Sequence, residues 1–189
     1  MRLLFVEEFK KDNPKYSYSI ETPTKEKYRF GETYEEIIQN IDIHKTSASL
    51  DMCVFKRNSN KYERVQNIEF KHKNTSIKNI GKDVLKLLRE EQNGAFILLL
   101  NNTNSGTLCN KNTNRMGIFN KFYKSFTDFK ANWNNVDKSI QLLILSLKEE
   151  VLIHRKINKT DLNNLQEIFF INNGCENITE IKENGWNIA

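Results

Sequence analysis

The stretch ASLDMCVFKRNSNKYERVQNIEFKHK, residues 48–73, decides the fold of this chain. Residues 48–56 are mostly apolar and carry a single acid, Asp51, so they predict a strand. The Asn and Ser residues within 57–62 are typical of a turn. Residues 63–73 then alternate polar and apolar side chains, as a second strand would. Because the connection is short, we expect the two strands to pair antiparallel.

Helical patterns and a buried strand flank this pair. Apolar residues recur at helical spacing in 31–41 and in 76–92, where Ser76 is a suitable N-cap. The run AFILLLNN, residues 95–102, predicts a strand that is buried on both faces. The order of these elements indicates an α/β protein with helices packed on a small mixed central sheet.

The rest of the chain gives weaker patterns. Residues 1–28 and the tail after 171 remain undecided between helix and strand. Residues 139–157 fit either one long helix or a hairpin, and their β-rich second half favours the hairpin. We further expect a loop at 102–114, an aromatic helix at 117–133, and a helix at 160–171 capped by Thr160.

Composition narrows the class of protein. A chain of 189 residues with 38% hydrophobic and 28% charged residues predicts one globular domain. Its longest apolar runs are too short to cross a membrane, and the N-terminus lacks a signal-peptide pattern, so we expect a cytoplasmic protein without a membrane partner. The net charge of +5 gives weak support to a polyanionic partner.

The three cysteines are Cys53, Cys109 and Cys175, which are far apart in the sequence and form no Cys-x-x-Cys pair. We therefore expect neither a disulfide scaffold nor a structural zinc site, and we expect Cys53 to be a small core residue. Glycine-rich phosphate loops, Gly-x-Ser-x-Gly elbows and His-Glu-x-x-His motifs are also missing from the sequence.

Three charged residues of the hairpin suggest chemistry. Glu69 and Lys71 are two residues apart, so they project from the same face of the second strand. Asp51 interrupts an apolar strand, where an acid needs a partner or a metal. Two carboxylates and a cation match what Mg²⁺-dependent phosphodiester hydrolysis requires. The alternative is a solvated face on which Glu69 and Lys71 form an ordinary charge pair.

Asp51 followed by Glu69-Phe70-Lys71 resembles the signature of the PD-(D/E)XK nuclease superfamily, although Leu50 replaces the proline of the motif. The resemblance implies a restriction-endonuclease-like core at about 31–101 within one domain spanning 1–189, with residues 102–189 as an elaboration. It implies a Mg²⁺-dependent DNA endonuclease, with Mn²⁺ as a substitute metal.

In that resemblance Asp51 and Glu69 bind the metal and Lys71 is the catalytic cation. Many members add a glutamate from the preceding helix as a metal ligand and catalytic residue. Glu35 is our choice for it, and Glu32 and Glu36 remain alternatives.

Basic residues surround these positions and fit a DNA partner. Lys73, Lys78 and Lys82 are candidate DNA contacts, although a solvated helix face explains Lys78 and Lys82 equally well. The aromatic residues of 117–133 fit core packing better than base stacking. A catalytically inactive nuclease-fold subunit that binds DNA or protein is the second hypothesis, and an unrelated small α/β domain is the third. The sequence leaves open whether the chain forms a homodimer.

Overall fold

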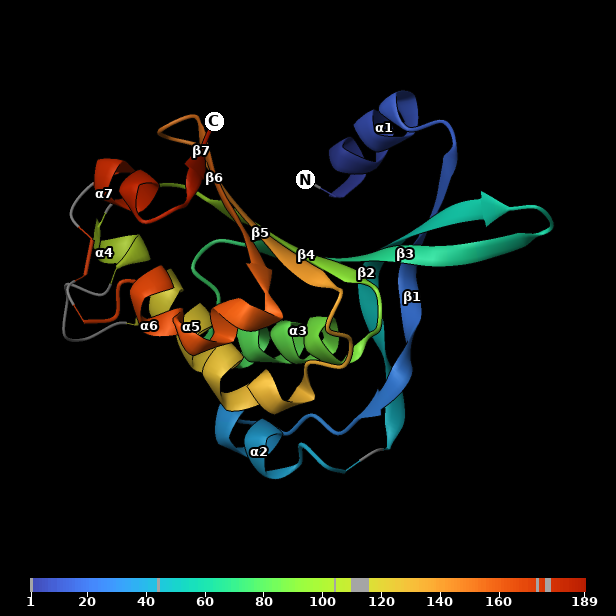
Figure 1. Ribbon diagram of the computed structural model, residues 1–189, viewed down its shortest axis with the longest axis horizontal. Coiled ribbons are helices and arrows are strands. Elements are labelled where there is room, and N and C mark those ends of the chain that lie inside the picture. The colour runs from blue at the N-terminus through green and yellow to red at the C-terminus, as the bar shows by residue number, and fades with distance from the viewer. Residues whose placement is uncertain (1, 44, 104, 110–115, 173, 176–177) are drawn as a thin grey trace.

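The computed structural model describes residues 2–43, 45–103, 105–109, 116–172, 174–175 and 178–189. These residues form a seven-stranded mixed sheet with helices on both faces (Figure 1). The strands lie side by side in chain order: β1 (Tyr16–Tyr28), β2 (Thr46–Asn58), β3 (Lys61–His72), β4 (Asn93–Leu100), β5 (Ser139–Ser146), β6 (Val151–Asn158) and β7 (Asn187–Ile188). Strands β3, β4 and β5 are parallel, and the other neighbouring pairs are antiparallel.

Two layers of helices cover the sheet. Helices α3 (Ile77–Arg89) and α5 (Ile118–Phe129) lie on one face, and α1 (Arg2–Asp12) lies on the other (Figure 1). Strand β5 shows why helices are needed on both faces of the sheet, because it carries apolar side chains on each of its two faces. Leu142 belongs to the larger core with α3 and α5, whereas Leu143 packs against the smaller cluster that includes α1.

The hairpin expected from residues 48–73 is confirmed as β2 and β3. Asn58 pairs with Lys61, and Ser59 takes a left-handed conformation with φ of 52° in the tight turn between them. The antiparallel ladder continues to the pair Met52 and Ile68. Both strands are longer than predicted, so the hairpin extends beyond the layers of helices (Figure 1).

Helix α3 begins where the sequence predicted, because the Ser76 hydroxyl accepts a hydrogen bond from the Asn79 amide. The short helix α2 (Tyr34–Gln39) packs against it. Gly81 makes this contact close: a Cβ there would lie 2.4 Å from Cε2 of Tyr34. A glycine that looked like a helix defect in the sequence is therefore required for α2 to approach α3.

The C-terminus of α3 is capped by a buried lysine from another segment. Lys138 is 3% exposed, and its ammonium donates hydrogen bonds to the backbone carbonyls of Leu87, Leu88 and Glu90. These carbonyls would otherwise lack partners inside the helix. Burial lowers the pKa of Lys138 to about 8, and the nearby carboxylates of Glu90 and Glu91 oppose that shift.

This pKa predicts a pH dependence of stability. Between about pH 8 and the ordinary lysine value of 10.5, the unfolded chain binds more protons at Lys138 than the folded chain does. Raising the pH through this window should therefore stabilise the wild type relative to a Lys138→Met variant, by about 1–3 kcal/mol. Urea unfolding of both proteins at several pH values measures the difference. If the free energy of unfolding of the wild type falls relative to that of Lys138→Met as the pH rises, the lowered pKa is contradicted.

Two expectations about the fold need correction. The sheet is not small, because β1 and the strands β5, β6 and β7 extend the predicted core to seven strands. The single helix expected at 160–171 is also wrong, since a 3-10 turn, η2 (Lys159–Asn163), precedes the short α6 (Leu165–Ile168). The cap is Asn158 rather than Thr160: Asn158 and Asp161 form a capping box that starts the turn earlier.

The remaining predictions have mixed outcomes. The hairpin at 139–157 is confirmed as β5 and β6, and Phe119, Phe122 and Phe126 of α5 are buried in the core, as core packing required. The segment predicted as a loop at 102–114 contains a helical turn and lies partly outside the described residues. The shorter elements are α4 (Ser105–Leu108), η1 (Lys130–Asn132) and α7 (Ile178–Glu183). No helix in the described ranges has the length and apolar character needed to span a bilayer.

Cysteine pairing was also mispredicted. Cys109 and Cys175 form a disulfide with their Cα atoms 5.5 Å apart, although 66 positions separate them in the sequence. Their sequence distance was therefore a poor guide, because the fold brings the two segments together. Cys53 is free and buried, as expected for a core residue.

Candidate active site

Asp51 lies where strands β2 and β3 stop pairing. The last backbone pair of the ladder is Met52 and Ile68. Asp51 is the residue before Met52 on β2, and its Oδ2 atom accepts a 2.8 Å hydrogen bond from the Phe70 amide. A carboxylate thus takes the place of a backbone carbonyl at the point where the ladder ends. This contact explains how an acid is accommodated within an apolar strand.

Glu69 and Lys71 both face helix α3, as their spacing predicted. The Oε1 atom of Glu69 lies 2.5 Å from the Lys86 ammonium, and Lys71 forms an ion pair with Asp83. Lys86 also lies 2.9 Å from Oδ1 of Asp83, so it joins the two pairs. The result is a continuous chain of four charges that links β3 to α3.

Lys86 reaches β2 as well as β3. Its ammonium donates a 2.9 Å hydrogen bond to the Ser49 carbonyl, two residues before Asp51. Its long side chain therefore connects α3 with both strands of the hairpin. This connection holds the strands in position at the end of their ladder.

The electrostatics of the site centre on Glu69. Burial raises the pKa of its carboxyl well above the usual range, the Asp83 carboxylate raises it further, and the Lys86 ammonium opposes both. The Asp51 carboxylate adds a smaller upward contribution to the pKa of Glu69. Burial by itself lowers the pKa of Lys86, but Asp83 and then Glu69 outweigh it and raise that pKa. The cluster is thus a coupled set of acids and lysines.

Exposure divides the cluster into two zones. Glu69 is only 1% exposed and Asp83 is 3% exposed, so both carboxylates lie beneath the surface. Asp51 and Lys71 are partly exposed. Asp51 and Lys71 are therefore more accessible to solvent than Glu69.

The donor set suits a hard cation in part. Asp51 and Glu69 offer carboxylate oxygens, and one or two carboxylates with waters are the usual protein contribution to a Mg²⁺ site. Within the described ranges, no group of three or more His, Cys, Asp and Glu side chains is arranged to hold a metal. The carboxylates of Asp51 and Glu69 are of the kind that such a site uses, and substrate and water would supply its remaining ligands.

The predicted glutamates of the upstream helix have other positions and partners. Glu35 is exposed on α2. The Glu36 carboxylate accepts a 2.6 Å hydrogen bond from the Glu32 amide and so helps to cap α2. The Glu32 carboxylate lies 3.7 Å from the Lys78 ammonium. These contacts give Glu32 and Glu36 structural partners. Glu32 and Glu35 are both exposed, whereas Glu36 is partly buried.

The predicted DNA contacts also differ from one another. Lys73 is exposed just after β3 and has a φ of 63°. Lys82 is partly buried with its ammonium 4.8 Å from the centre of the Phe30 ring, and burial is the main cause of its lowered pKa. Lys73 is therefore the most accessible of the three predicted lysines.

Asp83 and Lys86 escaped the sequence-based prediction. Both lie in α3 among apolar residues such as Val84 and Leu87, and both are buried. The apolar stripe of the helix in the sequence does not include them, so only their burial in the folded protein shows that they need partners. Those partners are Lys71 and Glu69, on the neighbouring strand.

Comparison with protein-family profiles, curated proteins and solved structures finds no match to this chain. Inferences about its function therefore rest on the geometry of its own residues.

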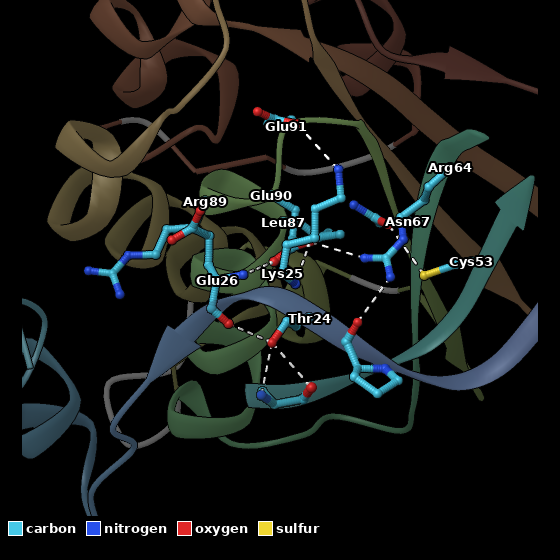
Figure 2. Close-up of polar contacts among 12 residues, drawn as sticks. Thr24, Lys25, Glu26, Cys53, Arg64, Asn67, Leu87, Arg89, Glu90 and Glu91 are labelled. Atoms are coloured by element: carbon cyan, nitrogen blue, oxygen red, sulfur yellow. Dashed lines mark hydrogen bonds and ion pairs between the residues drawn. The ribbon is translucent and has the colours of Figure 1, made fainter. Parts of the chain in front are cut away.

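A further buried charge lies at the C-terminal end of α3 and serves the fold. Glu90 follows the helix, and its carboxylate accepts hydrogen bonds from the amides of Lys25 and Glu26 at 3.2 and 3.0 Å (Figure 2). The Arg64 guanidinium lies 3.1 Å from the same carboxylate and also donates to the Pro23 carbonyl. Glu90 thereby joins the end of α3 to β1 and β3.

Proposed function

We propose that this protein is a Mg²⁺-dependent endonuclease that hydrolyses phosphodiester bonds in DNA, with a PD-(D/E)XK-like core. Two observations support the proposal: Glu69 and Lys71 form ion pairs with Lys86 and Asp83 of α3, and the Asp51 carboxylate accepts a hydrogen bond from the amide of Phe70, which lies between Glu69 and Lys71. The order of elements adds support, since three antiparallel strands lead through α3 into the parallel strand β4.

Each residue has a role in this proposal. Asp51 and Glu69 would hold the metal, which when bound would supply Lewis acidity toward a phosphoryl oxygen. Lys71 stabilises negative charge that develops on the phosphate, as a compact ammonium can. Asp83 is a positioning residue, because its ion pair with Lys71 directs that ammonium. Glu35 is a further candidate ligand, and Lys73, Lys78 and Lys82 are candidate contacts to the DNA backbone.

Metal removal tests this function. Wild-type protein should convert supercoiled plasmid to nicked or linear forms in Mg²⁺ or Mn²⁺, and EDTA should abolish the conversion until metal is restored. An Asp51→Asn protein purified in the same way controls for contaminating nucleases. Cutting that persists in EDTA, or that the Asp51→Asn preparation shows equally, would refute the proposal.

The burial of Glu69 favours a second candidate function. A carboxylate that is 1% exposed and paired with Lys86 can serve the fold without binding a metal. The chain would then be an inactive nuclease-fold subunit that binds DNA or another protein, as a monomer or a homodimer. Salt-sensitive DNA binding with no cutting in any metal supports this candidate.

The proposed location is the cytoplasm, as the sequence suggested. The Cys109–Cys175 disulfide is the observation that weighs against it, because disulfides are rare in reducing compartments.

A further inference from the structure

The tip of the β2–β3 hairpin, residues 56–62, lies beside residues 14–17 at the start of β1. Together these two segments are called the arm. They line an open hollow of about 680 Å³. The arm projects at the end of the sheet away from β6 and β7 (Figure 1). Nothing in the nuclease proposal uses it.

The charge of the arm has one sign where the hollow opens. Among the described residues that line the hollow, Lys15, Lys56 and Arg57 are cations and none is an acid. The nearest acid along the strand is Glu63, which pairs with Lys56 across the ladder. Its carboxylate accepts a 2.7 Å hydrogen bond from the Asn58 side chain. All three cations are exposed, and Lys56 shares its face of the ladder with Glu63.

Two tyrosines stand among these cations. Tyr16 is 39% exposed and Tyr62 is 61% exposed, so both rings can be reached from solvent. Tyr62 pairs with Arg57 across β2 and β3, and Tyr16 pairs with Lys56 across β1 and β2. Each ring thus has a cation as its direct cross-strand neighbour, and the two pairs project from opposite faces of the strands because Lys56 and Arg57 are consecutive.

Exposed rings interleaved with cations match one type of partner. Single-stranded nucleic acid offers phosphates for the cations and unpaired bases that stack on aromatic rings. A duplex offers the phosphates, but its bases are stacked on one another and are unavailable to the rings. A purely acidic protein surface would use the cations and leave the tyrosines unexplained.

We propose that the arm is a binding site for single-stranded nucleic acid, with phosphates on Lys15, Lys56 and Arg57 and a base stacked on Tyr62. Arg57 lies six residues from Asp51 along β2, which corresponds to about 20 Å of strand. A strand bound at the arm would have to span this distance to reach Asp51 as well. The arm is therefore a separate site, and its binding does not require cleavage.

Fluorescence anisotropy with a labelled oligothymidylate in EDTA tests this site without any contribution from cleavage. A Lys15→Gln, Lys56→Gln, Arg57→Gln triple variant should lower the salt dependence of binding, with the slope of log affinity against log salt falling by about 2. A Lys130→Gln, Lys148→Gln, Lys159→Gln variant removes the same charge from exposed positions elsewhere and should bind like wild type.

Tyr62 provides the stacking test. Tyr62→Ala should weaken binding to the oligonucleotide about tenfold, whereas Tyr62→Phe keeps the ring and should bind like wild type. Tyr62→Ala and Tyr62→Phe should both leave the affinity for duplex DNA nearly unchanged. Equal losses of affinity in the arm triple variant and in the control triple variant would overturn the proposal. Equal losses for duplex and single strand in Tyr62→Ala would also overturn it.

The two proposals fail separately. Asp51→Asn should leave oligonucleotide binding in EDTA unchanged, whatever it does to plasmid cutting. A wild type that binds through the arm and never cuts refutes only the nuclease. A wild type that cuts while the arm variants bind normally refutes only the arm.

Discussion

Asp51→Asn is expected to slow metal-dependent plasmid cutting by about 10²–10³-fold while leaving the fold intact. The asparagine side chain has nearly the same shape, and its amide oxygen can still accept the hydrogen bond from the Phe70 amide. The end of the β2–β3 ladder should therefore stay as it is. The variant loses only the negative charge that would hold a cation. Initial rates of plasmid conversion, with circular dichroism of both proteins, measure the two effects.

Asp128→Asn is a matched control for this substitution. Asp128 lies on α5. Its carboxylate accepts hydrogen bonds from the Tyr34 hydroxyl at 3.0 Å and from the Lys124 ammonium at 3.1 Å. It thus makes polar contacts of the same kind outside the proposed site. Its amide variant should cut at the wild-type rate. If the two variants cut equally fast, Asp51 has no special role in the reaction.

The hairpin and its charges were predictable because their signals are local. Alternation in the second strand and the short turn determine the pairing, and a spacing of two residues places Glu69 and Lys71 on one face. The separation of β2 and β3 at Asp51 was not predictable in the same way. It depends on a side chain that replaces a backbone partner, which no pattern of apolar residues encodes.

The half of the site on α3 was missed because it depends on tertiary packing. Asp83 and Lys86 resemble ordinary charges of an exposed helix until the helix is placed on the sheet. Their core positions become informative only when Lys71 and Glu69 lie opposite them. The Cys109–Cys175 bridge was missed for the same reason, since contact between distant segments is a property of the whole fold.

Glu90→Gln is expected to lower the free energy of unfolding by about 3–5 kcal/mol. The Glu90 side chain is fully buried, and the Arg64 side chain is 11% exposed, so the substitution leaves a nearly buried guanidinium without its countercharge. The new amide group also brings donors to a position that faces the Lys25 and Glu26 amides, which are donors themselves. Urea unfolding at neutral pH measures the loss.

Glu91→Gln makes the same chemical change at the next residue and serves as the control. The Glu91 carboxylate lies 3.4 Å from the Lys25 ammonium, but its side chain is 62% exposed, so its loss should cost less than about 1 kcal/mol. Adding Arg64→Met to Glu90→Gln should then recover stability relative to Glu90→Gln alone, because the unpaired buried charge is removed. If Glu90→Gln costs no more than Glu91→Gln, the buried carboxylate does not hold the end of α3 against β1 and β3.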